Sequence, residues 1–91
     1  MTTARHETVH FSGRVQGVGF RYTALQVAKE FEVSGYVCNL PDGRVKLGVE
    51  GEGAEIDRFV AAIEERMHGY VRKTERACEP AAAGYVGFTI R

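Results

Sequence analysis

A short run near the start of the chain carries the residues best suited to chemistry. Its sequence is Gly13-Arg14-Val15-Gln16-Gly17-Val18-Gly19-Phe20-Arg21, and it joins a strand-like stretch to a helix-like stretch. The three glycines leave the backbone free to curl, and backbone N–H groups that converge at a helix N-terminus bind anions. An arginine at the rim adds a planar fork that matches phosphate oxygens. The run therefore predicts a phosphate cradle made of Arg14, Val15, Gln16, Gly17, Val18, Gly19, Phe20 and Arg21.

The length and the net charge of the chain limit its possible functions. Its 91 residues make one domain, and we expect residues 1–91 to fold as a single unit. The 12 basic and 12 acidic residues cancel, so any preference for anions must be local. No stretch has the apolar length of a membrane span or a secretory signal. We therefore expect a cytoplasmic protein that binds neither nucleic acid nor a membrane.

Hydrophobic periodicity places the glycine run between a strand and a helix. Alternation over residues 6–13 predicts a strand, and apolar residues at helical spacing predict a helix over about 21–32. Alternation on both sides of a Pro-Asp-Gly turn predicts a hairpin of two strands, 35–40 and 44–50. The glycine run thus lies between the end of a predicted strand and the start of a predicted helix.

The second half of the chain continues with one helix and two strands. After a glycine-rich break, an apolar stripe that begins at Ile56 predicts a helix that ends at Gly69. We expect a strand over 70–78, a loop over 80–84 and a last short strand over 85–90. The order β-α-β-β-α-β plus a terminal strand is the split β-α-β, ferredoxin-like arrangement. This predicts an α+β fold with both helices on one face of an antiparallel sheet.

This topology brings a second polar side chain to the glycine run. In a β-α-β unit the two strands run parallel, so strands 6–13 and 35–40 end at the same end of the sheet. Asn39 shares a strand face with Val37, which is the better core partner for the first helix. We therefore expect Asn39 to point to the helix side and to converge with the cradle and Arg21.

These residues resemble the acylphosphatase family. The resemblance rests on G-R-V-Q-G-V-G-F-R at 13–21 and on G-Y-V-C-N-L-P-D-G-R-V at 35–45, in that order and at that spacing. It covers nearly the whole chain and is faint from about 69 to 84. It implies hydrolysis of the carboxyl–phosphate bond of acyl phosphates. It also implies that Arg21 binds the phosphate and that Asn39 orients the attacking water.

An acyl phosphate suits a site of this composition. Its leaving group is a carboxylate, whose conjugate acid has a pKa near ~4, so it departs without a proton. Neither motif contains a histidine, and their one carboxylate, Asp42, belongs to the Pro-Asp-Gly turn. Without a general acid, catalysis reduces to positioning and charge stabilisation. The phosphate oxygens of the substrate are the candidate proton acceptor. We expect no metal and no cofactor, a small acyl phosphate as the partner, and a monomer.

Other reactive side chains have simpler interpretations. Cys38 and Cys78 lie far apart without a C-x-x-C spacing, and we expect two reduced thiols. His6, His10 and His68 do not have the spacing of metal ligands, so we expect surface or strand residues.

The sequence also contains a second motif that is typical of phosphatases. Cys38 and Arg44 have the C-x5-R spacing of cysteine-dependent phosphatases. That chemistry needs a loop that runs into a helix N-terminus. Here the segment crosses a Pro-Asp-Gly turn and continues as a strand, so we do not expect a thiol nucleophile.

Alternatives from other functional classes stay open. The same fold could hold a phosphate or carbamoyl-phosphate group without turnover, as a binding module. An RNA-binding domain of this fold needs aromatic side chains on the open sheet face, whereas the outward positions of the first and third strands carry His10, Ser12, Arg44 and Lys46. For single residues, the alternatives are a purely structural glycine turn, a solvated Arg14 and an Asn39 that merely ends its strand.

Overall fold

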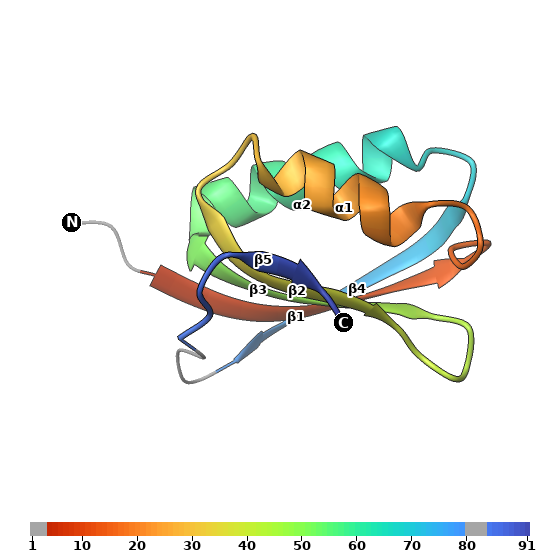
Figure 1. Ribbon diagram of the computed structural model, residues 1–91, viewed down its shortest axis with the longest axis horizontal. Coiled ribbons are helices and arrows are strands. Elements are labelled where there is room, and N and C mark those ends of the chain that lie inside the picture. The colour runs from red at the N-terminus through yellow and green to blue at the C-terminus, as the bar shows by residue number, and fades with distance from the viewer. Residues whose placement is uncertain (1–3, 80–83) are drawn as a thin grey trace.

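Two helices cover one face of a five-stranded sheet in the computed structural model, which describes residues 4–79 and 84–91 (Figure 1). The elements in chain order are β1 (Ala4–Gly13), α1 (Phe20–Ala28), β2 (Val33–Asn39), β3 (Val45–Glu52), α2 (Gly53–Arg66), β4 (Val71–Glu79) and β5 (Phe88–Ile90). The strand order across the sheet is β4-β1-β3-β2-β5. The α+β, ferredoxin-like order expected from the sequence is confirmed, including the short last strand.

One strand pairing differs from the expected antiparallel sheet. β1 pairs antiparallel with β3 and β4, and β2 pairs antiparallel with β3, but β5 runs parallel to β2. The direction of β4 explains the difference. β4 and β2 run in opposite directions, so a strand that starts at the end of the sheet where β4 finishes must run in the same direction as β2. The sheet is therefore mixed.

The first helix is shorter than its apolar pattern predicts. α1 ends at Ala28 rather than near residue 32. Beyond it, the N–H groups of Lys29, Glu30 and Phe31 donate to carbonyls three residues back at 3.2, 2.9 and 3.3 Å, the pattern of a 3₁₀ turn. This tighter turn still brings Phe31 to the core, with its ring centroid 6.2 Å from that of Phe59. The apolar periodicity thus continues past the end of the α-helix.

The other predicted elements are present with shifted ends. β3 continues through the predicted break because Gly51 still pairs with Arg5 on β1 and with Val33 on β2. The remaining shifts are the start of β1 at Ala4, the bounds of β2 at Val33 and Asn39, the end of α2 at Arg66, the bounds of β4 at Val71 and Glu79, and the start of β5 at Phe88. Of the loop predicted over 80–84, residues 80–83 lie outside the described residues. No helix in the described ranges is long and apolar enough to cross a membrane.

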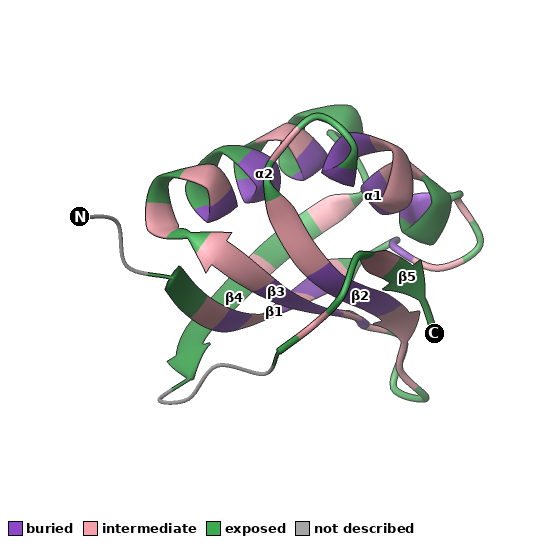
Figure 2. Ribbon diagram, turned by 60° about the vertical axis from the view of Figure 1, so that its left-hand side comes forward, coloured by how far each residue is buried: buried purple, intermediate pink, exposed green. Residues whose placement is uncertain are grey.

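The core lies between the sheet and the two helices (Figure 2). Its fully buried members come from both layers and include Val9, Phe11, Val37, Val45, Leu47, Val49, Ala24, Val27, Ile56, Phe59 and Ile63. Because side chains alternate along a strand, the burial of Val37 fixes the helix-facing side of β2. Asn39, two residues further on, is therefore directed to the same side.

One charged side chain belongs to this core. Glu7 on β1 is 2% exposed, and its two carboxylate oxygens accept hydrogen bonds from Arg76 at 2.8 and 3.0 Å. Arg76 on β4 also donates to Asp57 of α2 at 2.7 Å. The hydrogen bonds with Glu7, more than those with Asp57, hold the pKa of Arg76 above its ordinary value. This cluster joins the edge strand and the second helix to β1.

Arg76→Ala should destabilise the fold because, among the residues that the structure describes, it leaves Glu7 buried with the contact to Arg5 at 3.5 Å alone. We expect the free energy of unfolding, measured with urea, to fall by roughly 2 to 3 kcal/mol, somewhat less than for a fully buried pair, since Arg76 is 32% exposed. The matched control Arg66→Ala removes the exposed ion pair with Glu30 and should cost less than about 1 kcal/mol. Equal losses in the two variants would contradict the role given to burial.

Candidate active site

The loop between β1 and α1 is anchored at both of its ends. The Arg14 N–H donates to the carbonyl of Tyr70 at 2.8 Å. Val15 is 1% exposed and Phe20 is 2% exposed, and the ring centroid of Phe20 lies 4.9 Å from that of Phe11. These anchors hold the ends of the loop against the core, while Gly17 and Gly19 between them are exposed.

Two glycines shape the exposed part of the loop. Gly17 and Gly19 have φ angles of 76° and 79°, in the left-handed region that favours glycine. A Cβ atom at either position would meet nothing within 4 Å, so the backbone conformation, rather than close packing, requires glycine here. Gly19 is also the N-cap of α1, where no side chain caps the first turn. The first N–H groups of α1 are therefore available to an anion.

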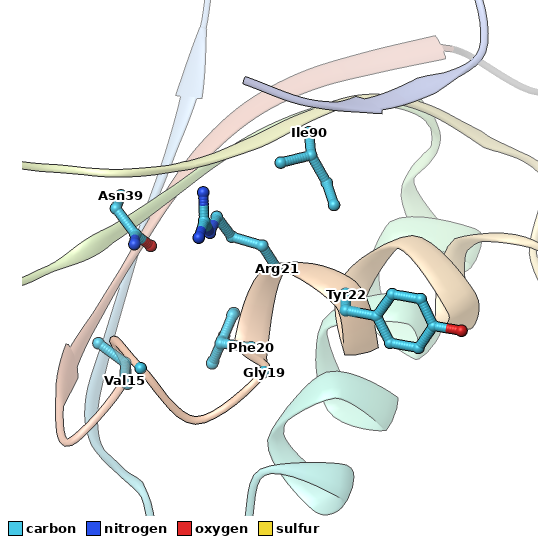
Figure 3. Close-up of a pocket in the computed structure, with 8 residues that line it drawn as sticks. Val15, Gly19, Phe20, Arg21, Tyr22, Asn39 and Ile90 are labelled. Carbon is cyan, nitrogen blue, oxygen red and sulfur yellow. The ribbon is translucent and has the colours of Figure 1, made fainter.

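A pocket of about 240 Å³ opens beside this loop (Figure 3). Its lining residues come from the loop, from the first turn of α1, from the end of β2 and from β5, and they are Val15, Gly17, Gly19, Phe20, Arg21, Tyr22, Asn39 and Ile90. Figure 3 shows the side chains of Arg21 and Asn39 pointing toward one another. The pocket thus places one cation and one amide next to the free N–H groups of a helix.

Asn39 lines this pocket and carries an oxygen without a hydrogen-bond partner. Its Oδ1 atom is buried, and no donor within residues 4–79 and 84–91 hydrogen-bonds to it. A buried acceptor without a partner costs about 1–3 kcal/mol, and native proteins rarely keep such an atom without a use for it. Figure 3 shows this oxygen on the side of Asn39 that faces Arg21.

The structure brings together most, though not all, of the residues that the sequence assigns to the site. Six of them line the pocket, namely Val15, Gly17, Gly19, Phe20, Arg21 and Asn39. Three others do not line it. Arg14 is exposed, Val18 packs against the core, and the Gln16 amide hydrogen-bonds to the turn that follows β2.

Two lining residues are absent from the sequence prediction. Tyr22 directly follows Arg21 in α1, so its position next to Arg21 could have indicated that it lines the pocket. Ile90 lies on β5 opposite Val37 of β2. Its place depends on which sheet edge β5 joins, and residue periodicity carries no information on that choice.

The acylphosphatase family model matches residues 7–90. The chain belongs to the acylphosphatase family. An acylphosphatase from Roseiflexus sp. is 51% identical over 83 residues, which cover 90% of this chain and 89% of that protein. One from Rubrobacter xylanophilus is 45% identical over 84 residues, covering 91% and 76% respectively. The crystal structure of acylphosphatase from Bacillus subtilis matches with a TM-score of 0.88 at 31% identity, covering 96% of this chain and 98% of that one. The chain is therefore a hydrolase of this family.

Cys38 lies on the opposite sheet face from the pocket. It is directly followed by Asn39, and adjacent strand residues point to opposite faces. The Arg44 side chain donates to Asp42 at 2.8 Å, within a turn that leads into β3 rather than into a helix. This arrangement lacks the features that a C-x5-R thiol site needs. Cys38 and Cys78 are unpaired.

Tyr36 is an aromatic residue on the open face of the sheet, opposite to the face of Val37 and Asn39. Tyr36 is 8% exposed, with the Arg91 guanidinium 4.0 Å from its ring centroid and Tyr85 packed against it edge-on. Its ring is covered rather than presented for base stacking. No group of three or more potential ligands among residues 4–79 and 84–91 has the geometry to hold a metal ion.

Gly19→Ala should weaken the binding of inorganic phosphate without unfolding the protein. An alanine in the left-handed region costs roughly 1–2 kcal/mol, so the loop would relax to another conformation and affinity should fall about tenfold. Isothermal titration calorimetry with phosphate measures the change. The matched control is Gly84→Ala, since Gly84 also has a positive φ of 71° with open space around it. Gly84 donates to Glu50 at the other end of the sheet, and its variant should keep the parent affinity.

Proposed function

We propose that this chain hydrolyses the carboxyl–phosphate bond of acyl phosphates in the pocket between the β1–α1 loop and Asn39, releasing a carboxylate and inorganic phosphate. The observation that carries the proposal is the buried, unpartnered Oδ1 of Asn39, which faces Arg21 across the pocket. Membership of the acylphosphatase family supports the same reaction.

The phosphoryl group binds to the loop side of the pocket. Arg21 offers two parallel N–H donors to its oxygens, and the first N–H groups of α1 supply further donors with the positive end of the helix dipole. Charge on the transferring group is spread over its equatorial oxygens. The helix N–H groups are fixed by the fold, so together with Arg21 they stabilise that charge with little reorganisation during the reaction.

The attacking water binds to Asn39. One O–H of the water donates to Oδ1. This hydrogen bond orients a lone pair of the water oxygen in line with the phosphorus atom and opposite the leaving oxygen. The new bond forms between water oxygen and phosphorus, and the bond from phosphorus to the acyl oxygen breaks with its electron pair. The carboxylate departs, one proton of the water passes to a phosphate oxygen, and the other stays on the oxygen newly bound to phosphorus. The step needs no group outside substrate, water and pocket.

The acyl group lies against the apolar wall of the pocket. Ile90 lines the pocket and is 41% exposed, and Phe20 is a second apolar residue of the lining. An apolar acyl group gains about 25 cal/mol for each Å² that it buries on such a wall. A small acyl group such as acetyl reaches less of this surface.

Arg21→Ala and Asn39→Ala should both abolish turnover of benzoyl phosphate, with EDTA present throughout, while circular dichroism shows an unchanged fold. Each change removes a group that acts in the transition state, and we expect kcat to fall at least about a hundredfold. Inorganic phosphate should bind weakly to Arg21→Ala and normally to Asn39→Ala. A folded parent that binds phosphate without any turnover would favour the binding module instead.

Ile90→Asn should reduce the preference for large apolar acyl groups. We expect kcat/KM for benzoyl phosphate to fall roughly fivefold, the effect of losing about 1 kcal/mol of apolar contact, with acetyl phosphate nearly unaffected. Val86→Asn is the matched control, because Val86 is 93% exposed and does not line the pocket. Parallel losses for both substrates in Ile90→Asn would place the acyl group elsewhere.

A further inference from the structure

Gln16 makes the contact that joins the two halves of the proposed site. Its Nε2 donates one hydrogen bond to the Leu40 carbonyl at 2.8 Å and one to the Arg44 carbonyl at 2.9 Å. Both N–H bonds of the amide are therefore used, and both acceptors lie in the turn that follows β2. The Gln16 side chain is half-buried and does not line the pocket.

The acceptors of Gln16 belong to a well-ordered turn. The Leu40 N–H donates to the Arg44 carbonyl at 2.8 Å, and the Gly43 N–H donates to the Leu40 carbonyl at 3.1 Å. Asp42 accepts hydrogen bonds from the Arg44 N–H and from the Arg44 guanidinium. Both bonds lower the pKa of Asp42, and the bond from the N–H has the larger effect. The two carbonyls that Gln16 contacts are thus fixed in direction.

Gln16 makes the polar contact between the loop and the hairpin. Gly17 and Gly19 have open space around them, and Val15, Val18 and Phe20 pack against the core through apolar side chains. Among the described residues, no other hydrogen bond from residues 15–20 reaches the hairpin. Within the described residues Gln16 is therefore the hydrogen-bonded link between the loop and the hairpin, and its acceptor Leu40 is the next residue after Asn39.

We propose that Gln16 is a positioning residue that aligns the phosphate-holding loop with the water held by Asn39. This inference rests on the proposed function. The sequence prediction places Gln16 in the phosphate cradle, whereas its side chain acts through the Leu40 and Arg44 carbonyls. Displacing one reacting group by about 1 Å can cost a hundredfold in rate. Loss of the Gln16 contacts should therefore lower kcat and leave phosphate affinity nearly unchanged.

The test uses Gln16→Glu, which keeps the shape of the side chain but removes both donors. We expect kcat for benzoyl phosphate to fall about 10- to 100-fold, while the inhibition constant of inorganic phosphate changes less than about threefold. A protonated carboxyl group regains one O–H donor. The ratio of the variant kcat to the parent kcat should therefore rise as the pH falls through the region of a glutamate pKa, ~4.3. A purely structural role would not produce this pH profile.

Gln26→Ala is the matched control, because it removes an amide from α1 outside the pocket lining and should keep the parent kcat. Urea unfolding of every variant identifies any loss of fold, and Gln16→Asn, which is shorter by one methylene, provides a second test if Gln16→Glu unfolds. An unchanged kcat in folded Gln16 variants would overturn the proposal. So would a loss of phosphate affinity at constant kcat, since Gln16 would then bind the phosphate itself.

A separate measurement distinguishes this proposal from the proposed function. In the phosphate-free protein, the side-chain amide resonances of Asn39 should move in the ¹⁵N–¹H spectrum of Gln16→Glu and stay in place in Gln26→Ala. This readout needs no turnover. If the parent fails to hydrolyse benzoyl phosphate, the proposed function fails, and the Asn39 resonances still decide whether Gln16 positions this residue.

Discussion

The candidate site depends first on the burial of Val37. β2 is extended, so residues two apart share a face, and a slip of one residue would exchange the two faces. Val37 and its partner Leu47 on β3 are both fully buried, and each such side chain stabilises the register by about 1.5–3 kcal/mol. This register directs Asn39 into the pocket. A slip would direct Cys38 there instead, so the core selects the side chain that the pocket receives.

The pocket itself is built from parts that are unfavourable on their own. The unpaired oxygen of Asn39 costs about 1–3 kcal/mol, close to the gain from burying one aliphatic side chain. The loop gains little from packing at Gly17 and Gly19, which have open space around them. Burial of Val15 and Phe20 offsets these costs by fixing both ends of the loop to the core. Buried residues that stabilise the fold thus lie next to the residues of the site along the chain.

The convergence of Arg21 with Asn39 could be predicted because it depends on local rules. Alternation along a strand and the parallel direction of strands in a β-α-β unit are set by residue pattern and chirality. The end of α1 was less predictable, since a 3₁₀ turn and an α-helix both bring Phe31 to the core. The monomeric state and the cytoplasmic location stay predictions.

The contacts of Gln16 and Ile90 could not be predicted from residue patterns. Gln16 donates to backbone carbonyls. Every residue type has a backbone carbonyl, so the residue types at the partner positions do not indicate the contact. Ile90 reaches the pocket because β5 joins the open edge of β2. That choice depends on where β4 ends in three dimensions, which a pattern of alternating residues does not encode.

The chemistry of the lining explains why an anhydride suits this pocket better than a phosphate monoester. Among the eight lining residues, none carries a carboxyl or imidazole group, and Figure 3 shows the Tyr22 ring directed away from Arg21 and Asn39. An alcohol leaving group has a conjugate acid with a pKa near that of water, ~15.7, so its departure needs a proton donor that this lining does not offer. A carboxylate, with a conjugate-acid pKa near ~4, leaves unprotonated. In the proposed mechanism, Arg21 and the helix N–H groups stabilise charge on the phosphoryl oxygens in either case, so the leaving group determines which substrates the site turns over.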